Sequence, residues 1–122
     1  MPKDDYDVIV FKILLYYYGC LKRKIIFDTV SFNHATDKNN IDESYFTDVL
    51  IMMFEDGLLD NVSYTTAWGN ERILTGNLSD IRITSSGIKY LKENAKMQKT
   101  KDFFIKNITP ITSLIKLIFD VI

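Results

Sequence analysis

The stretch Ile81-Arg-Ile-Thr-Ser-Ser-Gly-Ile-Lys-Tyr-Leu91 decides the fold of this chain of 122 residues. Its first three residues predict a short strand. Thr84 or Ser85 can cap the helix that follows, because a hydroxyl oxygen accepts hydrogen bonds from the unpaired N–H groups of a first turn. Ile88 and the final leucine of the stretch are predicted to face the core. Gly87 has no side chain, so this helix can lie close against the sheet.

Another helix lies upstream and ends in Phe54-Glu-Asp-Gly-Leu-Leu59, where Asp56 and Gly57 break it. Asn40 and Glu43 have the spacing of a capping box and predict where it begins. Helical periodicity predicts a buried side made of Phe46, Val49, Leu50, Met53 and Phe54. The opposite side is then predicted to face solvent, with Ser44, Thr47, Asp48, Ile51 and Glu55.

Between these two helices, from Leu58 to Ile83, the chain is rich in β-branched and aromatic residues and predicts extended structure. Gly69-Asn70 separates two such runs, and glycine at the first of two loop positions favours a type II′ hairpin turn. The segment Thr75–Asp80 predicts a bulge or small loop in the returning strand. We therefore expect a β-hairpin between the two helices.

The N-terminal part of the chain predicts a long helix that begins at Asp4 or Asp5 and ends at Gly19. The helix is apolar on two sides, so we expect either the C-terminal segment or a second subunit to cover the side that faces away from the core. The first side comprises Tyr6, Ile9, Val10, Ile13, Leu14 and Tyr17, and the second Val8, Phe11, Leu15, Tyr16 and Tyr18.

Shorter elements follow this helix. Lys22-Arg-Lys24 predicts a turn, Ile25-Ile26 a short strand, and Asp28 to His34 a brief helix. The order of helices, hairpin and helix predicts an α+β winged helix-turn-helix over residues 1–94, with the hairpin as the wing. Residues 95–122 are predicted to form a basic, then apolar, C-terminal helical extension that packs on the same domain or on a partner subunit.

The sequence also resembles a known family. Gly87-Ile-Lys-Tyr-Leu-Lys-Glu-Asn94, followed by a lysine-rich amphipathic tail, is similar to the YjcQ family of small proteins from bacteria and their phages. The similarity covers roughly Asp4 to Lys116 and is strongest from Asp56 onward. It implies a winged-helix fold with a C-terminal helical extension, and it carries no functional residue with it. This chain departs from the family pattern in a longer wing and an apolar end after Pro110.

Composition fits one soluble domain, with 47% hydrophobic and 25% charged residues. The formal net charge of −1 hides an uneven distribution. Residues 1–27 carry +2, residues 28–80 carry −8 and residues 81–122 carry +5, as counted from the sequence. A single cysteine, Cys20, and a charged N-terminus without a signal-peptide pattern favour a cytoplasmic location.

Catalysis is not expected from this sequence. His34 is the only histidine, so neither a serine nor a cysteine nucleophile has a second candidate base of the usual kind. The carboxylates Asp42, Glu43, Asp48, Glu55, Asp56 and Asp60 do not follow calcium-loop spacing. We expect no cofactor, no metal and no small-molecule substrate.

DNA binding is one hypothesis, because winged helices commonly place the helix before the wing in the major groove. The exposed side predicted for that helix holds two carboxylates and no cation, which opposes contact with phosphates. The remaining route to DNA uses cations on the wing and the C-terminal helices. These candidates are Arg72, Arg82, Lys89, Lys92, Lys96 and Lys99.

Protein interaction is the rival hypothesis, and we place it slightly ahead. The apolar segment Ile111–Ile122 is too short to cross a bilayer and needs burial, which packing on the first helix would provide, either within the chain or in a dimer. The candidate interaction surface comprises Phe11, Leu15, Tyr18, Trp68, Leu114, Ile118 and Phe119. The sequence thus predicts a non-catalytic module that binds another macromolecule.

Overall fold

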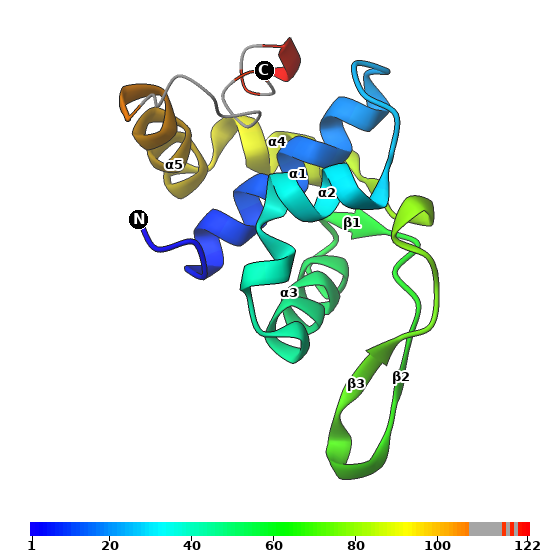
Figure 1. The fold of residues 1–122 in the computed structure, drawn as a ribbon. Coiled ribbons are helices and arrows are strands. Elements are labelled where there is room, and N and C mark those ends of the chain that lie inside the picture. Colours follow the sequence, from blue (N-terminus) through cyan, green and yellow to red (C-terminus); the bar gives the residue numbers. More distant parts are fainter. Residues whose placement is uncertain (108–115, 117, 119) are drawn as a thin grey trace.

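The computed structural model describes residues 1–107, 116, 118 and 120–122. Its helices are α1 (Tyr6–Leu21), α2 (Thr29–Thr36), α3 (Glu43–Glu55), α4 (Ser85–Glu93) and α5 (Ala95–Lys106). Its strands are β1 (Leu59–Asp60), β2 (Tyr64–Thr66), β3 (Arg72–Leu74) and β4 (Arg82–Ile83), with 3₁₀ turns at Lys38–Asn40, Trp68–Asn70 and Leu78–Asp80. This mixed α+β order of three helices, a hairpin and C-terminal helices confirms the predicted winged-helix fold (Figure 1).

Helix α1 is the centre of the molecule. It contacts α2, α3, α4, α5 and β4, so nearly every residue from Val8 to Gly19 is buried. Figure 1 shows α1 crossing the helical body, while the hairpin of β2 and β3 extends away from that body. The apolar character of both sides of α1 is therefore explained by burial within the same chain.

The start of α1 agrees with the prediction, but its end does not. Asp5 caps its start as expected, because the Asp5 carboxylate accepts a hydrogen bond from the N–H of Asp7 at 3.0 Å. The predicted end at Gly19 is wrong, since the helix continues to Leu21. A Cβ at Gly19 would lie 3.0 Å from Ile25 Cδ1 and 3.1 Å from Val121 Cγ2. Close packing of two other segments, and not a helix cap, explains this glycine.

The connection from α1 to α3 differs from the prediction at two points. The predicted strand at Ile25-Ile26 is absent, and these residues lie in a loop in which Ile26 is exposed. Helix α2 is confirmed, with the Asp28 carboxylate accepting from the N–H of Ser31 at 2.9 Å. The start of α3 is capped by Asp42 and not by Asn40, because Asn40 ends the preceding 3₁₀ turn.

Two small antiparallel sheets follow α3. Strand β1 pairs with β4 through Leu59 opposite Ile83, and β2 pairs with β3 through Thr65 opposite Ile73. The predicted two-residue type II′ turn is wrong. The loop contains three residues, Trp68–Asn70, in which Gly69 and Asn70 both have positive φ angles of 74° and 61°. The predicted interruption of the returning strand is confirmed as the loop before β4.

Helix α4 agrees closely with the sequence. The Thr84 hydroxyl accepts from the N–H of Gly87 at 2.9 Å and donates to the carbonyl of Gly57 at 2.6 Å, so it caps the helix and ties it to the end of α3. A Cβ on Gly87 would lie 2.3 Å from the carbonyl oxygen of Leu58. The absence of that atom lets α4 rest directly on the chain before β1, as predicted.

The chain after α5 is described only in part, so most of the predicted helix at Ile111–Ile122 lies outside the described residues. Lys116, Ile118, Asp120 and Val121 are helical, and Ile118 and Val121 are buried in this chain. The Lys22 ammonium donates a hydrogen bond to the carbonyl of Val121 at 2.7 Å. The last residues therefore contact the end of α1.

Candidate interaction surface

The wing is fixed to α3 by polar contacts along one side of that helix. The Arg72 guanidinium on β3 lies 3.2 Å from Asp48 Oδ1 and 3.6 Å from Glu55 Oε1. Near the start of α3, the Ser44 hydroxyl donates to Glu71 Oε1 at 2.6 Å. One cation of the hairpin thus bridges two carboxylates that lie two turns apart on α3.

This arrangement overturns the predicted exposure of α3. Thr47 and Ile51 were expected to face solvent, but both are buried, and Ile51 is completely inaccessible. Asp48, Ile51 and Glu55 share one side of the helix because they are separated by three and four residues. Since Arg72 joins the first and last of these, the wing lies over the side of α3 that was predicted to be free.

A neighbouring strip of α3 remains accessible. Tyr45 and Met52 are 37% and 42% exposed, and the side chains of Asp48 and Glu55 are about half exposed beside them. Residues 45 and 52 are separated by seven positions, so they lie on the same side of the helix. The accessible surface of α3 therefore combines two large apolar side chains with carboxylates. Sequence periodicity missed Tyr45 and Met52 because the position of the wing decides which side of α3 is covered.

The tip of the wing carries the most exposed large hydrophobic side chain among the described residues. Trp68 is 98% exposed, at the first position of the three-residue loop. The loop is closed by a hydrogen bond from the N–H of Ala67 to the carbonyl of Glu71, 2.7 Å long. On β3, Ile73 is also about half exposed. The tryptophan therefore projects into solvent and does not fold back over the sheet.

The structure does not gather the candidate nucleic-acid residues into one patch. Arg72 lies on the wing and is paired with carboxylates, whereas α4 and α5 lie at the opposite end of the molecule (Figure 1). Lys92 on α4 has its ammonium 5.4 Å from the ring centre of Tyr18, and Lys96 on α5 is 3.7 Å from Asp7. The other three, Arg82, Lys89 and Lys99, are exposed on β4, α4 and α5.

Most of the candidate interaction surface is occupied within the chain. Phe11, Leu15, Tyr18 and Ile118 are buried, and Phe11 stacks on Phe104 with ring centres 6.1 Å apart. A partner at those positions would first have to displace α5 or the C-terminal residues. Leu114 and Phe119 lie outside the described residues. Of this set, Trp68 is the residue that the structure presents to solvent.

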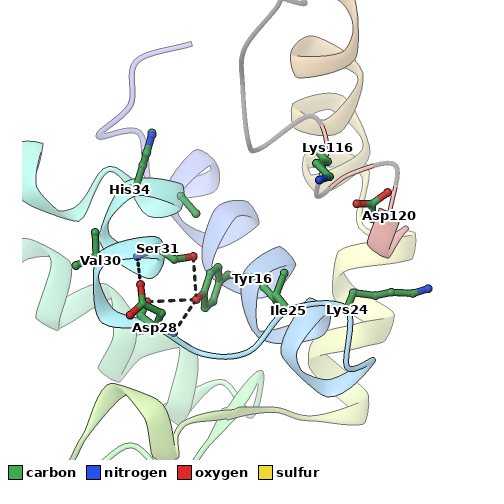
Figure 2. Close-up of a pocket in the computed structure, with 10 residues that line it drawn as sticks. Tyr16, Lys24, Ile25, Asp28, Val30, Ser31, His34, Lys116 and Asp120 are labelled. Atoms are coloured by element: carbon green, nitrogen blue, oxygen red, sulfur yellow. Dashed lines mark hydrogen bonds between the residues drawn. The ribbon is translucent and has the colours of Figure 1, made fainter.

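A cavity of about 510 Å³ lies between α2, the end of α1 and the C-terminal residues (Figure 2). Figure 2 shows Lys116 and Asp120 on the side of the cavity away from α2. The Tyr16 hydroxyl in its wall is 3.2 Å from Ser31 Oγ and accepts from the N–H of Asp28 at 3.2 Å. These three residues are hydrogen-bonded to one another, whereas Lys24, His34, Lys116 and Asp120 also line the cavity. No periodic pattern in the sequence indicates this cavity, because three distant segments form it.

Two further features of the described residues concern a reactive cysteine and a metal site. Burial raises the pKa of the Cys20 thiol to about 11, which keeps it protonated and unreactive at neutral pH. His34 is exposed on α2, and it lines the cavity with Ser31. Within the described residues, no three side chains of His, Cys, Asp or Glu come together to hold a metal ion.

The chain matches one known protein family. The family model described as YjcQ protein matches residues 11–109, a stretch that begins within α1 and includes all of α2 to α5. No curated protein and no solved structure matches the chain. Among the described residues, none of the helices combines the length and apolar character needed to cross a membrane.

Proposed function

We propose, from the premise that this chain belongs to the YjcQ protein family, that it is a winged-helix module that binds proteins through α3 and the wing. The observation that carries the proposal is the pairing of Arg72 with Asp48 and Glu55. It places the wing over the side of α3 that would enter a DNA groove, and it uses the cation that would otherwise contact phosphate.

The charge of this surface indicates the chemistry of the partner. Residues 41–80 contain eight carboxylates and one cation, Arg72. The carboxylates are Asp42, Glu43, Asp48, Glu55, Asp56, Asp60, Glu71 and Asp80. Such a surface repels nucleic acid and attracts a polypeptide segment that is rich in lysine or arginine.

Apolar side chains supply the affinity that charge alone does not. Trp68, Tyr45 and Met52 are residue types enriched at protein interfaces, and all three are accessible. Tryptophan and tyrosine are frequent among the residues whose truncation costs most of the binding energy. Trp68 projects from the tip of a hairpin and can enter a pocket on a partner without rearrangement of this fold.

The test uses Trp68, the single tryptophan of the chain, as the reporter. Titration of the full-length protein with a synthetic amphipathic helical peptide rich in lysine and free of tryptophan should shift Trp68 emission to the blue, because the indole becomes desolvated. Met52→Ala should weaken that binding several-fold. Val30→Ala, which truncates an exposed apolar residue on α2, is the matched control and should leave it unchanged. An equal shift with a glutamate-rich peptide would refute the proposal.

DNA binding remains the second candidate, because Lys89, Lys92 and Lys99 are exposed on α4 and α5. It is tested by titrating random duplex DNA at two salt concentrations. Tight binding that weakens strongly with salt, and that is lost when Lys92, Lys96 and Lys99 are replaced together by alanine, would place DNA ahead of protein. We also propose that the protein is cytoplasmic, as expected from the sequence.

A further inference from the structure

Two segments of this chain carry opposite net charge. The region from α3 to the wing holds eight carboxylates and one cation, whereas residues 81–107 hold seven cations and two carboxylates. These cations are Arg82, Lys89, Lys92, Lys96, Lys99, Lys101 and Lys106. Figure 1 shows the wing and α5 at opposite ends of the fold. The chain therefore contains the kind of basic surface that its own acidic end is proposed to bind.

The basic end is hollowed where a side chain could enter. A groove of about 570 Å³ runs along α5 and is lined by Lys99, Phe103 and Lys106, and also by Asp102 and Met1. Lys99 and Lys106 are seven residues apart, so both lie on the same side of the helix. The half-buried ring of Phe103 packs edge-on against Phe104, with ring centres 5.5 Å apart.

This groove matches the chemistry of the wing tip. An indole ring attracts ammonium groups above its face more strongly than other aromatic rings do, and it packs well against the edge of a phenyl ring. Trp68 placed between Lys99 and Lys106 would have both contacts.

From this complementarity we infer that the basic partner of the α3–wing surface is α5 of a second copy of this chain, with Trp68 of one copy in the α5 groove of the next. The inference rests on the proposed function, for which it names the partner. Because the two surfaces are different and lie at opposite ends, the contact is head-to-tail. Such contacts produce rings or open chains and not a closed symmetric dimer.

Sedimentation velocity of the full-length protein tests the self-association. At low salt, the average mass should rise with protein concentration above the monomer mass of 14.2 kDa, and the Trp68 emission should shift to the blue in parallel. Added salt should reverse both effects, because the attraction acts between exposed charges. A chain that stays monomeric at every concentration at low salt overturns the inference.

Two variants separate the two ends. Trp68→Ala removes the tip and leaves the groove, while Lys99→Glu combined with Lys106→Glu removes the groove and leaves the tip. Each variant alone should be monomeric. Mixed in equal amounts they should form a dimer and nothing larger, since only one productive contact remains. Lys101→Glu reverses the charge of one lysine outside the groove and should associate nearly as the natural chain does.

The outcomes distinguish this inference from the proposed function. If the chain is monomeric but its Trp68 emission still shifts with the lysine-rich peptide, self-association is refuted and protein binding stands. If neither occurs, both are refuted. Association that persists in Trp68→Ala also refutes the head-to-tail contact, because another surface must then hold the copies together. A mixture of the two variants that stays monomeric refutes it as well, because the intact tip and the intact groove then do not bind.

Discussion

At the scale of single residues, Gly87 fixes the distance between α4 and the chain before β1. A methyl group there would meet the Leu58 carbonyl at 2.3 Å and Ile83 Cγ1 at 2.8 Å. Since the first obstacle is backbone, we expect Gly87→Ala to lower the free energy of unfolding by about 2–3 kcal/mol, as overpacking does. Urea denaturation would measure it. Ser86→Ala is the control and should change stability by less than about 0.5 kcal/mol; equal stability of both variants would contradict the packing argument.

Lys12 is a buried cation whose partner comes from another element. Its side chain is 5% exposed, and its ammonium pairs with the carboxylate of Asp37 and lies 5.5 Å from the ring centre of Phe104. Asp37→Asn keeps a residue that tolerates the positive φ of 58° but leaves the ammonium unpaired. We expect it to cost about 1–3 kcal/mol, and Lys12→Met to cost less, because a buried charge without a partner is worse than an apolar side chain. Thermal denaturation giving the opposite order would reject this account of the pair.

Cys20 should react slowly in the folded protein. Burial raises the pKa of its thiol to about 11, so little thiolate is present at pH 8. Alkylation by iodoacetamide at pH 8 should therefore be much slower in the native protein than in denaturant. The pKa of this thiol is higher in the folded protein than its usual value of 9.0. The thiol therefore contributes fully to the free energy of unfolding below pH 9, and that contribution declines as the pH rises toward 11. Equal alkylation rates in both states would contradict this prediction.

At the scale of elements, the position of the wing depends on Arg72. The ion pairs with Asp48 and Glu55 are partly exposed, so their contribution to global stability is below about 1 kcal/mol each. Their effect on the hairpin alone should be larger. We expect Arg72→Gln to accelerate hydrogen exchange in β2 and β3, with little change in the melting temperature. Arg82→Gln, on β4, is the matched control. Unchanged exchange in Arg72→Gln would mean that apolar packing alone holds the wing.

At the scale of the whole molecule, α1 is covered by every other helix and by the last residues of the chain. Val121 packs on Gly19, and its carbonyl accepts from Lys22. Val121→Ala should therefore lower the free energy of unfolding by about 1–2 kcal/mol, at the scale of a small core truncation. If this contact forms within one chain, the loss is independent of protein concentration. A loss that shrinks on dilution would show that the contact joins two chains, because a bound partner stabilises less as its concentration falls.

Charge separation is the second property of the whole molecule. The total charge of −1 gives no indication of it, whereas the acidic middle and the basic end are evident from the order of residues. In the fold the wing and α5 lie at opposite ends (Figure 1), whereas Arg82 on β4 lies opposite Asp60 on β1. The sequence thus predicted the asymmetry, and the fold decides that the two charges are presented in different directions.

Local signals determined much of the architecture. The caps at Asp5 and Thr84 could each be narrowed to two neighbouring residues, because a cap acts within three residues of itself. The close approach at Gly87 was readable because glycine weakens a helix, so its presence in a first helical turn indicates that a side chain would not fit there. The cap of α3 at Asp42 was missed since Asn40, two residues earlier, offers the same chemistry.

Contacts between distant segments could not be read in the same way. Gly19 has the residue type of a helix end, yet it is held against Ile25 and Val121, and Ile51 falls on the polar side of α3, yet it is buried. The sequence by itself determined the elements, their caps and the separation of charge, because hydrogen bonds and periodicity act over a few residues. Only the tertiary structure decided that Arg72 faces Asp48 and Glu55 while Trp68 faces solvent, because the direction of a hairpin depends on packing between segments far apart in the chain.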